Sequence, residues 1–296
     1  MQIGIVEETQ PRDPNGGLSV RDGGATRDRR RLLEDDAPDG FNFHFSRSFH
    51  DAEPGESFRT PRHNHTFQQI KFAEKGAIDV SPGQYINEGE LGYFPKGAYY
   101  GPQHREKGLT SIVCQYGFNG EHQRGDYWES RRGEVLERLK ARGVIENGLF
   151  IERDPESGET ITRDSVDALY DERYRMLKGV PLNIPQPTYD APILIHPGNA
   201  SYYQAAPGVM LKQLGHFFDQ PGPNGDVSIS IARLDGGTIE LDADRPQIAW
   251  TVHPGLEVHG RTCDSAAAIY CPRGETARIG GADGIEVYLV RFPRLD

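Results

Sequence analysis

The sequence predicts an all-β fold of two barrels joined by a helical connecting segment. Three observations lead to this prediction. Stretches in which apolar and polar residues alternate recur on both sides of a central region, and turns containing Gly or Pro separate them. The central region instead carries apolar residues at helical spacing. A weak internal repeat relates the two flanking regions, which indicates a duplicated barrel.

The composition is that of a soluble globular protein with many turns. Hydrophobic residues make up 36% of the 296 residues and charged residues 26%, while 35 glycines and 21 prolines favour short strands over long helices. The net charge is −11 and the sequence pI is about 5.4. Such a chain repels nucleic-acid phosphates and anionic lipid, so neither nucleic acid nor a membrane is an expected partner.

The cellular compartment is predicted from the cysteines and the N-terminus. The three cysteines show no C-x-x-C spacing, which fits a reducing compartment. Residues 1–13 are polar and lack the apolar core of a signal peptide, and no apolar run reaches about 18 residues. We therefore expect a cytoplasmic protein.

The first two segments differ in pattern. Residues 1–38 mix Gly, Asp and Arg without a strand or helix period. They are expected to form a polar N-terminal arm, either loose or lent to a partner subunit as an edge strand. The first barrel is expected over residues 39–120, where phenylalanine alternates with polar residues at 41–46 and Gly or Pro turns separate the later strands.

Residues 121–195 are expected to form a helical linker packed beside the barrels. One helix is predicted over residues 126–142, because Asp126 and Glu129 resemble a capping box and apolar residues follow on one face. A second helix is predicted over residues 165–178, where an Asp precedes the helical pattern and a Gly follows it.

The second barrel is expected over residues 196–296. Its Gly255 and its Pro272-Arg-Gly274 turn follow one another at nearly the spacing of Gly76 and Pro95-Lys-Gly97 in the first half. The recurrence of this pair of turns is the main support for a duplicated barrel.

The most informative pattern lies in the first barrel. It runs His63-Asn-His65, then Gln69 and Gly76, and then a second glycine shortly before Pro95-Lys-Gly97. Two His two residues apart on a strand point to one face, and a carboxamide four residues later shares that face. Imidazole nitrogens suit borderline divalent metals, and an amide can add an oxygen ligand.

This pattern resembles the two motifs of the cupin superfamily, G-x5-H-x-H-x3/4-E-x6-G and G-x5-P-x-G-x2-H-x3-N. The resemblance implies a bicupin, in which each barrel is of the double-stranded β-helix or jelly-roll type. It also implies one divalent metal inside a barrel, held by two His and the Glu of the first motif and the His of the second. Carried over to this chain, His63 and His65 match, Gln69 replaces the Glu, Tyr100 takes the second-motif His position, and His104 takes the Asn position.

The expected metal ligands are therefore His63, His65, Gln69 and His104, and the expected catalytic residues are His63, His65 and Tyr100. Fe(II) is the favoured metal, with Zn(II), Mn(II) and Ni(II) as alternatives. The neutral Gln69 leaves this site one negative charge poorer than the usual cupin set, which lowers its affinity for a dication.

The second barrel is expected to have lost its ligand set. Counting back from Gly255 places Asp242, Asp244 and Ile248 at the first-motif ligand positions, and counting forward from Gly274 places Ala277 at the second-motif His position. Neither Ile248 nor Ala277 can bind a metal.

Three functions remain open. The first is a metal-dependent enzyme that acts on a small organic metabolite in the first barrel, with dioxygenase-type chemistry slightly favoured. The second is a metal-free isomerase, dehydratase or cyclase that uses His63 and His65 as acid and base. The third is a bicupin that binds a small molecule without catalysis. A homodimer is also possible, because Ile70 and Phe72 form an apolar face opposite the expected ligands; the alternative is that they pack within the chain.

Overall fold

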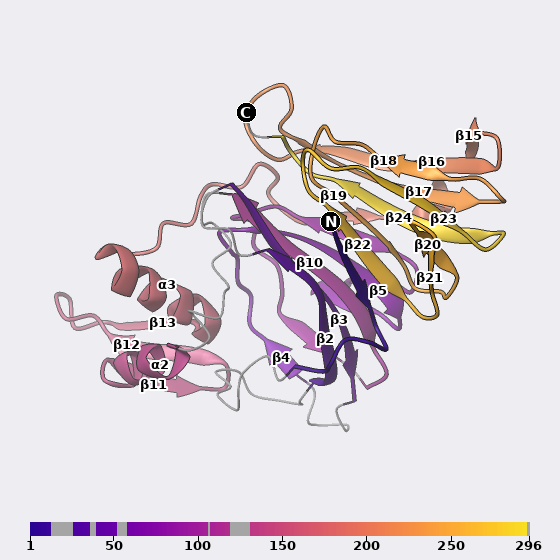
Figure 1. Cartoon of the computed structure of the whole chain (residues 1–296). Helices are drawn as coiled ribbons and strands as arrows, with labels where there is room; N and C mark the ends of the chain where they lie inside the picture. Colours follow the sequence, from indigo (N-terminus) through magenta and orange to yellow (C-terminus); the bar gives the residue numbers. More distant parts are fainter. Residues whose placement is uncertain (13–25, 36–39, 52–57, 106, 119–130, 295–296) are drawn as a thin grey trace.

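The computed structural model describes residues 1–12, 26–35, 40–51, 58–105, 107–118 and 131–294. Figure 1 shows two groups of strands packed against each other, with a smaller helical unit beside the first group. The predicted all-β, double-barrel fold is confirmed. In the described ranges, no helix is long and apolar enough to cross a membrane.

The first barrel is built on a six-stranded sheet in the order β14-β8-β5-β10-β3-β2. Two smaller sheets, β4-β9 and β6-β7, complete it, and β6 lies beside β9. The bounds are β2 Thr26–Asp35, β3 Phe41–His50, β4 Phe58–Thr60, β5 Gln68–Lys75, β6 Ile78–Ser81, β7 Gln84–Ile86, β8 Leu91–Phe94, β9 Gln103–Arg105, β10 Thr110–Phe118 and β14 Ile193–Ile195.

The second barrel consists of a seven-stranded sheet in the order β1-β22-β19-β24-β17-β16-β15 and a four-stranded sheet in the order β18-β23-β20-β21. A short 3-10 helix, η1, precedes its strand β15. The bounds are β1 Gln2–Ile5, η1 Pro197–Asn199, β15 Tyr203–Ala206, β16 Val209–Phe218, β17 Asp226–Leu234, β18 Ile239–Leu241, β19 Gln247–Thr251, β20 Leu256–Val258, β21 Arg261–Cys263, β22 Ala267–Cys271, β23 Ala277–Gly281 and β24 Ile285–Arg291.

The two barrels exchange edge strands, and this differs from the predicted segments. The arm expected over residues 1–38 is not loose in its described parts: β1 pairs with β22 of the second barrel and β2 pairs with β3 of the first. In return β14, which was assigned to the linker, pairs with β8 of the first barrel. Charged residues on β2 concealed its strand character, because residues 27–31 are all charged and the two leucines that follow are adjacent, so apolar and polar residues do not alternate.

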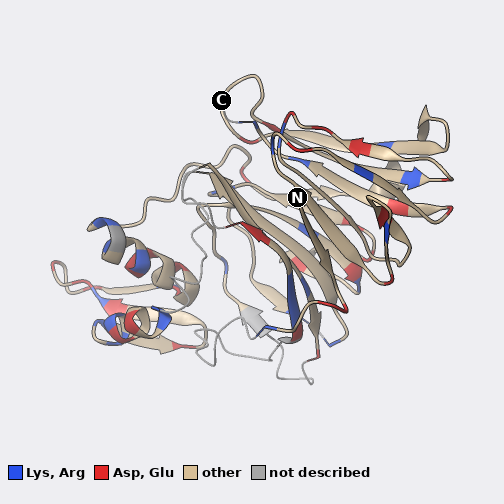
Figure 2. Ribbon diagram, in the orientation of Figure 1, with Lys and Arg blue, Asp and Glu red and all other residues tan. Residues whose placement is uncertain are grey.

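The linker forms a small unit of its own, called here the linker subdomain, with both helices and a three-stranded sheet. It comprises α2 Arg132–Lys140, β11 Gly143–Glu146, β12 Leu149–Arg153, β13 Thr160–Asp164 and α3 Ser165–Lys178. Acidic and basic residues are interspersed over it (Figure 2). Its own small core includes Leu139 and Phe150.

The predicted bounds of α3 are confirmed. The Asp164 carboxylate accepts hydrogen bonds from the amides of Val166 and Asp167, and Gly179 ends the helix in the left-handed conformation with φ +73°. The proposed capping box at Asp126 and Glu129 lies outside the described residues, and α2 begins at Arg132.

The outer faces of the two large sheets pack against each other and form the main core. The rings of Phe72 and Tyr288 lie 4.8 Å apart, and Ile70 belongs to the same buried cluster. The apolar face of β5 is therefore covered by the second barrel of the same chain, so it does not support the expected subunit interface.

Candidate functional site

A pair of backbone hydrogen bonds brings His63 to Tyr100. The two residues form an isolated β-bridge in which each amide donates to the other's carbonyl oxygen at 3.0 Å. Their rings lie 4.4 Å apart between centroids. His63 and His65 were expected to lie on one strand, yet of the two only His63 takes part in β pairing. The structure nevertheless brings His63 together with Tyr100, the residue at the second-motif His position.

The turn beyond Pro95 fixes this arrangement. The Gly97 amide donates to the His65 carbonyl oxygen at 2.8 Å, and the Asn64 side chain donates to the Gly97 carbonyl oxygen at 3.0 Å. Gly97 has φ +80°, and a Cβ there would lie 2.1 Å from the Pro185 carbonyl oxygen. Only glycine fits, because the linker passes directly over the turn.

His63 and His65 are both buried, with 2% and 8% of their surface exposed, and their ring centroids are 4.9 Å apart. Nδ1 of His63 lies 2.7 Å from the Pro61 carbonyl oxygen. A carbonyl oxygen can only accept, so Nδ1 carries the proton and Nε2 of the neutral ring is a proton or metal acceptor.

Gln69 and Tyr100 are joined directly. The Gln69 amide nitrogen donates to the Tyr100 hydroxyl at 2.7 Å, and the Gln115 amide nitrogen donates to the Gln69 oxygen at 3.0 Å. All three side chains are buried. Both ends of the Gln69 amide are thus engaged within the barrel.

Lys71 belongs to the same interior, and sequence reasoning missed it. It lies two residues after Gln69 on β5 and is 4% exposed. Its ammonium nitrogen lies 4.1 Å from the ring centroid of Phe94 and 4.2 Å from that of Tyr100. The period of two along β5 is the signal that could have found it, because it places Lys71 on the face of Gln69.

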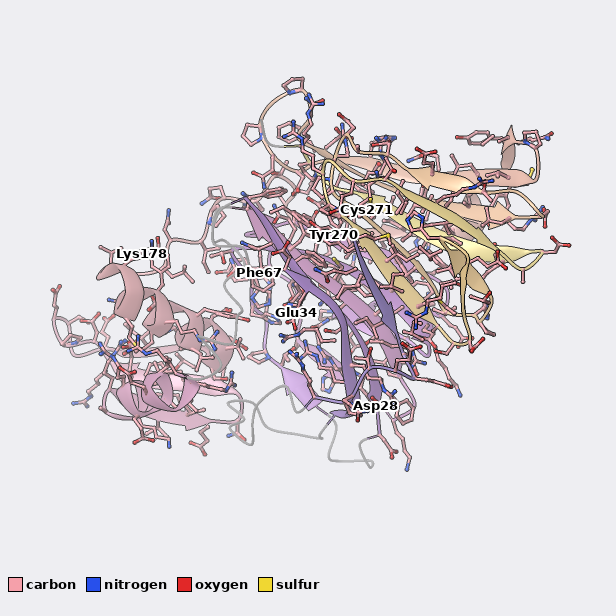
Figure 3. The ribbon with its side chains drawn as sticks, in the orientation of Figure 1. Asp28, Glu34, Phe67, Lys178, Tyr270 and Cys271 are labelled. Atoms are coloured by element: carbon pink, nitrogen blue, oxygen red, sulfur yellow. The ribbon has the colours of Figure 1, made fainter. Side chains whose placement is uncertain are left out.

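Helix α3 of the linker subdomain also reaches the site. Asp167 places a carboxylate oxygen 3.7 Å from His65 Nδ1, and the Tyr170 ring meets the His65 ring edge-on at 5.9 Å. Phe67 stacks on His65 at 4.6 Å, and it lies on the side of the barrel that faces α3 (Figure 3). Nothing in the local sequence pattern indicates this contact, because about a hundred residues separate the partners.

His104 does not join the cluster. Its side chain is exposed on β9, while the neighbouring Gln103 is 3% exposed. The expected position of His104 assumed that one continuous strand follows Tyr100. Instead β9 is three residues long and pairs with β4, and this register turns Gln103 inward.

The described residues supply fewer metal ligands than the usual cupin set. In the ranges that the structure describes, no group of three or more His, Cys, Asp or Glu is placed to hold a metal ion. The cluster offers two imidazoles and an amide that is already hydrogen-bonded at both ends. An ammonium in the same interior repels a dication, and no carboxylate of the usual first motif is present to offset it.

The interior of the second barrel is packed with apolar side chains, among them Ala249, Cys271 and Ala277. The structure also corrects the count between the two halves by one residue. Gln247 pairs with Cys271 as Gln69 pairs with Phe94, so Gln247 is the counterpart of Gln69. Ile248 instead faces the first barrel in the main core.

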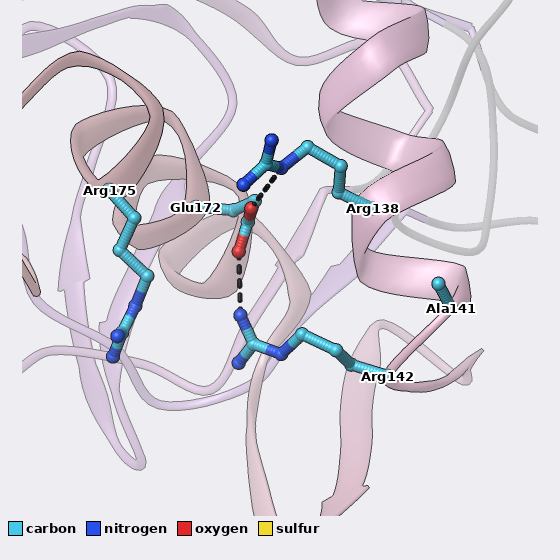
Figure 4. Close-up of a pocket in the computed structure, with 5 residues that line it drawn as sticks. All are labelled: Arg138, Ala141, Arg142, Glu172 and Arg175. Atoms are coloured by element: carbon cyan, nitrogen blue, oxygen red, sulfur yellow. Dashed lines mark hydrogen bonds and ion pairs between the residues drawn. The ribbon is translucent and has the colours of Figure 1, made fainter. Parts of the chain in front are cut away.

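A shallow hollow on the linker subdomain collects three arginines around Glu172 (Figure 4). Arg138 and Arg142 each donate to the Glu172 carboxylate at 2.6 Å, and Arg175 donates to Asp171 at 3.1 Å. Because each arginine has a carboxylate partner, we interpret this network as a structural link between α2 and α3.

No family model matches the sequence, and no curated protein matches it. Solved structures, by contrast, do match this chain. A putative dioxygenase from Nostoc punctiforme aligns with a TM-score of 0.56 at 14% identity, over 98% of this chain and 81% of that chain. A mutant of oxalate decarboxylase from Bacillus subtilis aligns with a TM-score of 0.50 at 12% identity, over 99% of this chain and 77% of that chain. At such identities these likenesses show the fold alone, which is the double-barrel cupin fold.

Proposed function

We propose that this chain is an enzyme that binds a small organic molecule inside the first barrel and transfers a proton with His63 and His65. The observation that carries the proposal is the hydrogen bond from His63 Nδ1 to the Pro61 carbonyl oxygen. This bond leaves Nε2 of a buried, oriented imidazole as a base, next to a second imidazole and a phenol.

The roles divide among three side chains. His63 removes a proton from the substrate through Nε2, and His65 returns a proton to another atom. Asp167, 3.7 Å from His65 Nδ1, helps to hold that ring in place. The Tyr100 hydroxyl, which accepts from Gln69, can donate its own proton to a substrate oxygen. Isomerisation, dehydration and cyclisation all follow from such a transfer.

A dioxygenase-type reaction at a divalent metal is the second candidate. Proteins commonly orient metal-binding imidazoles through a hydrogen bond from the second ring nitrogen to a backbone carbonyl, as His63 has with Pro61. Fe(II), Zn(II), Mn(II) or Ni(II) would then be held by His63, His65 and Gln69. The Gln69 amide would have to give up part of its present bonding to serve as a ligand.

We further propose that the second barrel is degenerate and has a structural role. Its described interior is lined by apolar side chains, Gln247 is bonded to Asp242, and its outer face completes the main core. A small-molecule substrate would accordingly bind only in the first barrel.

Deuterium exchange tests the proposal whatever product the reaction forms. The protein is incubated in D2O and a chelator with a panel of small keto acids, hydroxy acids and aldoses, and NMR records the loss of carbon-bound protons. We expect exchange that falls about 100-fold or more in His63→Gln, the usual contribution of a general base. His104→Gln, which changes an exposed His, is the matched control and should exchange like the parent.

Three outcomes would count against the proposal. Exchange that appears only after Fe(II), Zn(II), Mn(II) or Ni(II) is added would favour the metal-dependent candidate. Equal exchange rates in the parent and in His63→Gln would contradict proton transfer by His63. The absence of exchange with every member of the panel would contradict it too.

A further inference from the structure

A buried lysine lines the interior of the first barrel beside the proposed acid and base. Lys71 is 4% exposed, and the faces of Phe94 and Tyr100 lie 4.1 and 4.2 Å from its ammonium nitrogen. Aromatic faces attract a cation, which helps to explain how the barrel accommodates this charge away from water.

The register of the sheet shows what surrounds Lys71 on the inner face. Lys71 pairs with Val113 of β10, which pairs with Ser46 of β3. The adjacent row contains Gln69, Gln115 and His44 in the same order. Val113 is apolar, Ser46 presents a hydroxyl, Gln69 and Gln115 present amides and His44 presents an imidazole; Lys71 adds a positive charge to these two rows.

Tyr100 connects the ammonium to the proposed base. The Tyr100 ring lies 4.4 Å from the His63 ring and 4.2 Å from Lys71 Nζ. Tyr100 is therefore in contact with both the imidazole and the ammonium. The cupin motifs carry a carboxylate at the position of Gln69, whereas here that carboxylate is absent and a side-chain cation, Lys71, lies in the interior.

We infer that the first barrel binds an organic anion, a small carboxylate, with its carboxylate oxygen on the ammonium of Lys71. This inference rests on the proposed function and names its substrate class. An ammonium offers three hydrogen-bond donors and a full charge, both of which a carboxylate accepts well.

The same contact assists the chemistry. When His63 Nε2 takes the proton from the carbon next to the carboxylate, the C–H bond breaks and its electron pair moves onto the carboxylate oxygens. Lys71 then faces the oxygen on which negative charge grows, and this stabilises the enolate-like state. The proton returns from His65 or from His63 to carbon, so the reaction needs no oxidant, reductant or metal.

Competitive affinities for charged and neutral probes test the inference. NMR titrations in chelator measure the dissociation constants of malonate and benzoate against those of malonamide and benzamide. We expect each carboxylate to bind the parent at least 10-fold more tightly than its amide. Lys71→Met, which keeps the length of the side chain and removes its charge, should abolish that preference. Lys75→Met is the control, because Lys75 is exposed on the same strand.

A second neutral variant, Lys71→Gln, replaces Lys71→Met should the latter not fold. The inference is overturned if acids and amides bind the parent equally, if neither acid binds, if the preference survives in the neutral variant, or if it needs a divalent metal. Equal binding of acids and amides together with His63-dependent exchange would leave the proposed function intact with a neutral substrate. Lys71-dependent binding without exchange would instead identify an anion-binding protein that is not an enzyme.

Discussion

The side-chain amide of Gln69 donates a 2.7 Å hydrogen bond to the hydroxyl of Tyr100, inside the first barrel. These two residues occupy the positions that hold a Glu and a His in the cupin motifs. Two positions that usually converge on a metal are thus bonded to each other. Gln115 completes a chain of donors by bonding to the Gln69 oxygen at 3.0 Å.

Restoring the motif carboxylate should create a metal site. We expect Gln69→Glu to raise the affinity for Mn(II) or Zn(II) by at least 10-fold over the parent, because two imidazoles and one carboxylate form a ligand set that divalent metals favour. Isothermal titration of chelator-treated protein measures the affinity. Gln115→Glu adds the same charge at the neighbouring position and is the matched control. Stoichiometric metal in the parent would contradict the prediction and support the metal-dependent candidate.

Local signals in the sequence were sufficient for much of the fold. Asp164 and Gly179 mark both ends of α3, because a cap and a left-handed glycine act within one turn of the helix. Repeated Pro-x-Gly turns indicated the duplicated barrel. The cupin motif placed Tyr100 among the site residues, and the structure pairs it with His63 beyond the Pro95 turn.

The errors arose where position along the chain does not determine which face a residue occupies. The segment from Gln247 to Gly255 is one residue longer than the segment from Gln69 to Gly76. Counting back from Gly255 therefore placed Ile248 at the position of Gln69, whereas the pairing with Cys271 shows that Gln247 occupies it. The expected position of His104 was wrong for the same reason, because a one-residue change in register moves a side chain to the other face of a strand. Asp167 comes from the linker subdomain, and no local pattern connects it with His65.

The two barrels share one buried polar contact that a single substitution can test. Tyr93 on β8 donates a 2.8 Å hydrogen bond to the carboxylate of Asp219, which follows β16 of the second barrel. The two residues are 0% and 4% exposed. Burial, with the Asp219 carboxylate beside it, raises the pKa of Tyr93 well above its ordinary value, so the phenol keeps its proton.

We expect Tyr93→Phe to lower the free energy of unfolding by about 1 to 3 kcal/mol, because it leaves a buried carboxylate oxygen without this donor. Urea denaturation at pH 7 measures the change. Tyr85→Phe removes a hydroxyl from a tyrosine that is 46% exposed and should change the stability by less than about 0.5 kcal/mol. Equal stabilities of Tyr93→Phe and the parent would show that the contact does not hold the barrels together.

The stability of the fold should depend on pH through His50, at the end of β3. Burial lowers the pKa of His50 to about 3, and the charges of Arg105 and Arg29 act in the same direction. In the unfolded chain the pKa is near its ordinary value of about 6.5. Between these two values the unfolded state binds the additional proton. Stability from a neutral, buried His50 is therefore complete above about pH 6.5 and is lost progressively as the pH falls towards 3.

From pH 7 to pH 5 this linkage predicts a loss of about 2 kcal/mol in the free energy of unfolding. His50→Gln cannot take up a proton there, so its stability should fall by about 2 kcal/mol less over the same interval, whatever its level at pH 7. His253→Gln removes an exposed His and should keep the slope of the parent. Urea denaturation at several pH values gives the three slopes. A parent slope that matches that of His50→Gln would show that His50 is protonated in the folded barrel, and that the environment of β3 accepts its charge.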